Sequence, residues 1–132
     1  MARQKHFTNL DKGFSGSIRA LSTNDLEKGD IVYISKCIGS RITVSPADAQ
    51  YAKRSTGLLF VAERKTTAGY PVEFLSYMIV TYIGEGKEGD TLYLKKKGKW
   101  GATKTKTSKP IGKILGGREN ELSALIAPQG QY

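Results

Sequence analysis

The feature that most limits how this chain can fold is a short motif that occurs twice. A glycine and an aspartate precede an apolar, β-rich run at residues 28–34, and the same pair precedes a similar run at residues 88–94. Glycine adopts the positive φ that a tight turn needs, and aspartate accepts hydrogen bonds from backbone amides where a strand begins. The motif therefore predicts matching structural turns at Gly29, Asp30, Gly89 and Asp90.

The segments that follow each copy keep the same order. Each copy is followed by a glycine turn, then by a strand that opens with glycine, and then by a closing apolar strand. These segments are Gly39, residues 56–60 and residues 72–75 in the first half, and Gly98, residues 111–115 and residues 122–126 in the second. We interpret the shared order as a structural duplication. The simpler alternative is that two β-rich halves resemble one another without a common plan.

The remaining apolar runs are short and separated by glycine turns. They are rich in β-branched and aromatic residues, which favour strands. They cover residues 30–34, 41–44, 58–62, 72–75, 78–83, 91–94, 110–115 and 122–126. Many short strands at this spacing are typical of a barrel or sandwich. The sequence therefore predicts an all-β fold, a small β-barrel or sandwich with an internal pseudo-repeat, in which residues 122–126 form a central or fully buried strand.

One short helix is predicted over residues 46–53. Ser45 stands at the N-cap position, Pro46 at the first helical position and Asp48 three residues after the cap. The three alanines in this segment also favour a helix. The residues before the first Gly-Asp pair are polar and lack a helical period. We therefore expect an extended N-terminal arm over residues 1–28 and a single β-barrel-like domain over residues 29–132.

The size and composition of the chain bear on how this domain is stabilised. The chain has 132 residues, which fits one domain, and 39% of them are hydrophobic. A small β domain with a thin core often gains stability from assembly with other subunits. We therefore expect the chain to bind copies of itself.

The charge is strongly basic and unevenly spread. The formal net charge is +9, and residues 91–113 hold eight lysines and no acid. A basic excess of this size indicates an acidic partner, such as nucleic acid or an acidic protein surface. The predicted hairpin tip carries a basic patch of Lys95, Lys96, Lys97, Lys99 and Trp100. A lysine hairpin with an aromatic residue suits a phosphate backbone and a stacked base, but the region lacks arginine, the usual residue for base recognition. Nucleic-acid binding is therefore the alternative to adhesion on an acidic protein, or to lysines that serve solubility alone.

The sequence offers no set of residues for catalysis, a metal or another cofactor. Its single histidine, His6, lies in the predicted arm, and its single cysteine, Cys37, follows a strand, where we expect a buried or half-buried thiol. One cysteine excludes an internal disulfide and fits a reducing compartment. No apolar run approaches the length of a membrane span, and the first residues lack the apolar stretch of a secretory signal. We therefore expect a non-enzymatic protein made in the cytoplasm, with no membrane partner.

The order of motifs resembles that of a known family. After the first Gly-Asp strand come a predicted Ala-rich helix, the run Thr-Gly-Leu-Leu-Phe-Val-Ala at residues 56–62 and Ala-Gly-x-Pro-Val at residues 68–72. Gly-Asp-x-Leu-Tyr at residues 89–93 then leads to Pro-Ile-Gly-Lys-Ile-Leu at residues 110–115 and a terminal apolar strand. Over residues 26–127 this order resembles the small capsid decoration, or cement, proteins of tailed bacteriophages.

The resemblance implies a β-barrel-like subunit on the outer surface of the mature virion head. Such subunits assemble as trimers, less often as dimers, over junctions of the major capsid protein and stabilise the shell, and they have no catalytic residues. The long N-terminal segment and the high lysine content depart from the family and leave open how this chain grips a capsid. In that role the arm would run along a neighbour and add a strand to a sheet edge. The expected contact residues are Arg3, Lys5, Phe7, Phe14 and Ile18.

Overall fold

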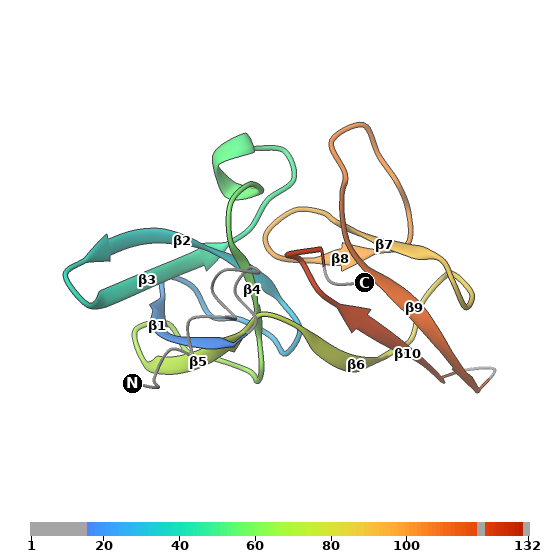
Figure 1. The fold of residues 1–132 in the computed structure, drawn as a ribbon, viewed down its shortest axis with the longest axis horizontal. Helices are drawn as coiled ribbons and strands as arrows, with labels where there is room; N and C mark the ends of the chain where they lie inside the picture. Colours follow the sequence, from blue (N-terminus) through green and yellow to red (C-terminus); the bar gives the residue numbers. More distant parts are fainter. Residues whose placement is uncertain (1–15, 119–120, 131–132) are drawn as a thin grey trace, which may run out of the picture.

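The chain folds into two β lobes that lie side by side (Figure 1). The computed structural model describes residues 16–118 and 121–130. The first lobe contains β1 (Ser17–Ser22), β2 (Ile31–Ile38), β3 (Arg41–Pro46), β4 (Leu59–Ala62) and β5 (Pro71–Leu75). The second contains β6 (Met78–Tyr82), β7 (Thr91–Leu94), β8 (Trp100–Gly101), β9 (Lys109–Arg118) and β10 (Glu121–Ile126). The predicted all-β barrel or sandwich is therefore confirmed.

The first lobe is a closed barrel and the second an open sheet. Strand order in the barrel is β1-β3-β2-β4-β5, and β5 pairs with β1 to complete the ring. The barrel also contains a short parallel pairing between β1 and β3, where Leu21 pairs with Thr43 and Ser22 with Val44. The second sheet has the order β6-β10-β9-β7-β8, so β6 and β8 are its two edges.

The pairing registers show that the two lobes share one plan. Ile31 pairs with Val61 and Val61 with Leu75 in the first lobe, and Thr91 pairs with Lys113 and Lys113 with Leu125 in the second. These pairings superimpose β2, β4 and β5 on β7, β9 and β10. The same registers place β1 on β6 and β3 on β8. The predicted pseudo-repeat is therefore present, although Phe60, and not Gly57, is the residue that corresponds to Gly112.

Residue size at the edges accounts for the difference between the closed and the open lobe. By register, Ala20 of β1 and Val44 of β3 correspond to Tyr82 of β6 and Trp100 of β8. The small side chains of the first pair let β1 and β3 approach and hydrogen-bond. In the second lobe the rings of Tyr82 and Trp100 stack with centroids 5.7 Å apart. The aromatic pair therefore holds the curled edges together without a backbone ladder.

Two apolar cores follow from this arrangement. The barrel interior is filled by a cluster that includes Phe60, Phe74 and Leu26. A second cluster joins Ile31, Leu59 and Val61 on the outside of the barrel to the inner face of the second sheet. All four residues of β4 are buried, because alternate side chains enter the two cores. The lobes therefore share one of their two cores and cannot be separated without exposing it.

The structure corrects the predicted helix. Strand β3 ends at Pro46, and the only helical element near residues 46–53 is a single 3-10 turn, η1 (Ala52–Arg54), among the described residues. Their backbone groups bond elsewhere: the Ala47 amide donates to Ile31 O over 2.8 Å, and the Ala49 amide donates to Lys95 O over 2.9 Å. A helix that began at Pro46 would pair the Ala49 amide with Ser45 O, and the bond to Lys95 O replaces that pairing, whereas the Ala47 amide belongs to the first turn and has no intrahelical partner to lose.

Part of the stretch predicted as an arm belongs to the barrel. Ser17–Ser22 form β1, and Leu26 is buried in the barrel core and bridges to Thr66. Burial follows the two-residue period of a strand, with Ala20 and Ser22 buried and Ile18 half-buried on one face, but the polarity pattern is broken because Ser22 faces inward and Leu21 outward. The prediction also missed β8, which has only two residues. The predicted central position of residues 122–126 is confirmed, since β10 pairs on both sides, but its outer face is partly exposed.

Candidate interaction surface

The two Gly-Asp turns have the same hydrogen bonds. Gly29 and Gly89 both have φ of 91°. The Asp30 carboxylate accepts from the Glu27 amide over 2.9 Å, and the Asp90 carboxylate accepts from the Lys87 amide over 3.0 Å. The glycine amides donate to Ala62 O and Ile114 O over 2.8 Å in each case. Both turns therefore have the geometry that the repeated motif predicted.

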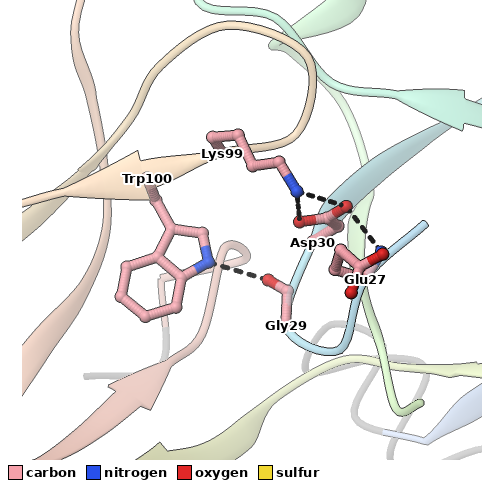
Figure 2. Close-up of polar contacts among 5 residues, drawn as sticks. All are labelled: Glu27, Gly29, Asp30, Lys99 and Trp100. Atoms are coloured by element: carbon pink, nitrogen blue, oxygen red, sulfur yellow. Dashed lines mark hydrogen bonds and ion pairs between the residues drawn. The ribbon is translucent and has the colours of Figure 1, made fainter. Parts of the chain in front are cut away.

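Among the described residues, the other lobe contacts the first turn and not the second. Figure 2 shows Lys99 and Trp100 of the second lobe meeting Gly29 and Asp30. The Lys99 ammonium lies 2.8 Å from one oxygen of the Asp30 carboxylate and 3.0 Å from the other. The Trp100 indole N–H donates to Gly29 O over 2.8 Å. The Gly29–Asp30 turn is therefore a docking point between the lobes.

The tip of the β7–β8 hairpin presses against the barrel. Lys97 has φ of 52° and Gly98 of 80°, and the Lys99 amide donates to Lys96 O over 3.0 Å, which defines a type I′ turn. The Ile31 amide donates to Gly98 O over 2.9 Å, and the Gly98 amide donates to Ala47 O over 2.6 Å. A Cβ on Gly98 would lie 2.8 Å from Ile31 O. Glycine is therefore required here both for its φ and for the close approach.

The predicted basic hairpin forms, but two of its five residues have structural partners. Trp100 is half-buried, packs against the shared core and stacks on Tyr82. Its ring is therefore not free to stack on a base. Lys99 forms the ion pair with Asp30. Lys96 and Lys97 are exposed, Lys95 is half-buried, and none of these three forms an ion pair with a described residue.

Three lysines of the hairpin, Lys95, Lys96 and Lys99, border a groove of about 650 Å³ on the side of the molecule where two loops project (Figure 1). One wall is the loop between β3 and β4, and the other is the loop between β8 and β9. The hairpin tip forms the floor. The lining residues are Ala49, Gln50, Lys95, Lys96, Lys99, Thr105, Lys106 and Thr107. The lining holds four lysines and no carboxylate.

The walls of the groove are tied together. The Lys109 ammonium at the start of β9 donates to Ser55 O in the opposite loop. Burial lowers the pKa of the Lys109 amine below its usual value of 10.5. The Thr105 amide donates to the Ser108 hydroxyl over 2.6 Å, which closes a turn at the tip of the second wall. The groove is therefore preformed.

Other predicted residues lie elsewhere or outside the described chain. Arg3, Lys5, Phe7 and Phe14 lie outside the described residues. Ile18 is in β1 and packs against the barrel core, so its side chain stabilises the barrel. Cys37, predicted to be buried or half-buried, is exposed near the tip of the β2–β3 hairpin, where its thiol lies 3.7 Å from Gly39 O.

The sequence pattern did not single out the groove itself. Lys106 belongs to the acid-free lysine run, but Ala49 and Gln50 carry no signal that would place them opposite it. Within residues 16–118 and 121–130, no group of three or more His, Cys, Asp or Glu side chains could hold a metal ion. In the same part of the chain, no helix has the length and apolar character of a membrane span.

Comparison with known proteins identifies a structural neighbour. No protein family and no curated protein sequence matches the chain. The fold is similar to the crystal structure of the head fiber gp8.5 N base in bacteriophage phi29, with a TM-score of 0.55. The similarity covers 85% of this chain and 93% of that chain, at 18% sequence identity. At this identity the shared feature is the fold, and it spans both lobes.

Proposed function

We propose that this chain is a non-enzymatic structural protein of a bacteriophage head. In this role it binds the outer surface of the major capsid protein lattice and stabilises the mature capsid. The observation that carries the proposal is the fold, because the similarity to a phage head fiber base extends over 85% of the chain. Fold alone does not define function. The motif order that resembles decoration proteins is a second, independent support.

The architecture suits a subunit that works by contact. The shared core and the hairpin tip fix the two lobes in one arrangement. A rigid subunit loses little conformational entropy when it binds, so more of its contact energy appears as affinity. Copies bound across a lattice add their contacts as avidity. In the proposal the subunits assemble as trimers, or as dimers, and the virion surface is their location.

The proposal is tested by mixing the purified chain with expanded, undecorated heads of the phage whose genome encodes it. We expect the chain to sediment with the heads at a fixed ratio to the capsid protein and to raise the temperature at which the heads release DNA. Unexpanded proheads are the control, and we expect less binding to them if the chain recognises the mature capsid surface. Absence of the chain from the pelleted heads would reject the proposal.

The alternative function, nucleic-acid binding by the basic hairpin, has less support. Its aromatic residue is engaged: the Trp100 indole bonds to Gly29 O and stacks on Tyr82. That function predicts binding to oligonucleotides that weakens steeply with salt and that depends on Trp100 more than on any one lysine. Oligonucleotide binding at modest salt that Trp100→Phe weakens more than Lys96→Ala would favour it over the capsid role.

A further inference from the structure

The lysine-lined groove between the two projecting loops carries an inference that rests on the proposed function and adds a binding site to it. We propose that this groove is the docking site for a short acidic polypeptide segment on the surface to which the chain binds. The groove is defined by residues 49–50, 95–96, 99 and 105–107.

Charge is the first argument. Lys95, Lys96 and Lys106 line the groove and form no ion pair within the described chain, while Lys99 is neutralised by Asp30. The nearest acid along the chain, Asp48, is buried and accepts hydrogen bonds from the Gln50 amide over 3.0 Å and the Lys97 amide over 3.4 Å. Three ammonium groups in a concave site attract carboxylates more strongly than the same groups on a flat surface. The groove therefore favours an anionic occupant.

Shape and apolar character select a polypeptide over a nucleic acid. A volume of about 650 Å³ admits a few residues of an extended chain. The methyl groups of Ala49 and the threonines, with the lysine stems, give the groove apolar walls. The loop that forms one wall also presents Tyr51 and Leu58, which are 52% and 49% exposed. No arginine lines the groove, and Trp100 is engaged in the shared core, so an oligonucleotide would find neither a base-recognition residue nor a stacking surface.

The groove is also held in shape before any partner binds. The Ala49 amide donates to Lys95 O over 2.9 Å, which joins the first wall to the floor, and Lys109 joins the two walls through Ser55 O. A preformed site costs less ordering entropy on binding. This geometry supports specific docking of a short segment.

The test uses a fluorescein-labelled hexaglutamate peptide as the probe and the full chain as the receptor. We expect anisotropy to report saturable binding that weakens as salt rises from about 50 to about 200 mM. A hexaglutamine peptide and an oligothymidylate of matched length are the comparison probes. Tighter binding of oligothymidylate than of hexaglutamate would overturn the inference.

Charge reversal locates the site. Lys96→Glu combined with Lys106→Glu is expected to weaken hexaglutamate binding about tenfold or more. The matched control is Lys36→Glu combined with Lys113→Glu, two exposed lysines outside the groove that change the net charge by the same amount. Equal weakening by both pairs would show that only net charge matters and would reject the groove.

Head binding separates this inference from the proposed function. If the wild-type chain sediments with phage heads and the groove variant does not, both stand. If the groove variant binds heads as the wild type does, the groove inference fails and the capsid role stands. If hexaglutamate binds in the groove but the wild-type chain does not sediment with heads, the capsid role fails and the groove remains an acidic-peptide site.

Discussion

The two lobes have the same turns and the same strand register, yet one closes into a barrel and the other stays open. Where the first lobe places Ala20 and Val44 on strands that meet, the second places Tyr82 and Trp100. The strand at the point of closure also differs in length: β3, which pairs with β1, has six residues, and its equivalent β8 has two. The closed and the open lobe therefore differ in side-chain size at two equivalent positions and in the length of one strand.

The open lobe uses its inner face and its hairpin to contact the closed lobe. Its inner face packs on the outside of the barrel, with Ile31, Leu59 and Val61 in the shared core. Its β7–β8 hairpin contacts the first Gly-Asp turn. Among the described residues, the equivalent β2–β3 hairpin of the first lobe does not contact the second Gly-Asp turn. The open copy of the repeat therefore forms the interface that holds the two copies together.

The largest effect is expected from Trp100→Ala. The change removes a ring that stacks on Tyr82, packs in the shared core and donates to Gly29 O. We expect the free energy of unfolding to fall by about 3 to 5 kcal/mol, as for other aromatic truncations in cores. Urea denaturation followed by circular dichroism measures it. Tyr77→Ala, at a 51% exposed aromatic residue, is the control and should change little. A small loss from Trp100→Ala would mean that the aromatic pair does not hold the open lobe.

The two aspartates of the repeat are expected to differ. Asp30→Ala removes a turn hydrogen bond and the charged contact with Lys99, and should cost about 2 to 3 kcal/mol. Asp90→Ala removes the equivalent turn bond alone and should cost about 1 kcal/mol. Denaturant titrations of the two variants give the difference. Equal costs would show that the docked hairpin adds nothing to the first turn.

The Tyr82 hydroxyl gives the open lobe a pH dependence. Burial raises its pKa above 10.0, the nearby Glu85 charge raises it further, and a hydrogen bond with the Ala102 backbone opposes both. Because the folded-state pKa exceeds the unfolded one, this contribution is fully present below pH 10.0 and is lost as pH rises through the folded-state pKa. Tyr82→Phe should lower stability by about 1 kcal/mol at neutral pH, through loss of the bond to Glu85 O, and should flatten the decline above pH 10.0. If stability declines above pH 10.0 as steeply in Tyr82→Phe as in the wild type, a group other than Tyr82 causes the decline.

The smallest effect has the opposite sign. Lys97 adopts φ of 52° in the type I′ turn, a conformation that asparagine tolerates better than lysine. Lys97→Asn should therefore stabilise the chain by about 0.5 to 1 kcal/mol. Thermal unfolding measures the gain. Lys96→Asn, at the neighbouring exposed residue, is the control, because no positive φ is present there. A loss of stability in Lys97→Asn would mean that the lysine side chain makes a contact of its own.

The sequence anticipated the features that depend on local chemistry. The Gly-Asp turns, the order of the repeated elements and most strands follow from glycine, aspartate and β-branched patterns. The helix over residues 46–53 was wrong because the Ala49 amide, which a helix would pair with Ser45 O, bonds instead to Lys95 O, which is distant in sequence. Strand β1 was not predicted because its polarity pattern is irregular: Leu21 faces outward and Ser22 is buried.

The candidate site was only half visible in the sequence. The lysine run identified the floor and one wall of the groove, but nothing local placed Ala49 and Gln50 opposite Lys106. The engagement of Trp100 also depends on Gly29, which is separated from it by most of the chain. Contacts between the lobes determine which basic residues are left without an ion-pair partner among the described residues. A pattern along the chain does not show these contacts.

We propose that this two-lobed chain lies on the outside of a phage head. Cryo-electron microscopy of expanded, undecorated heads, imaged with and without the added chain, tests it most directly. We expect additional two-lobed density on the outer surface at symmetry-related positions between capsid subunits. Shells that look the same with and without the chain, or density confined to the tail, would contradict it.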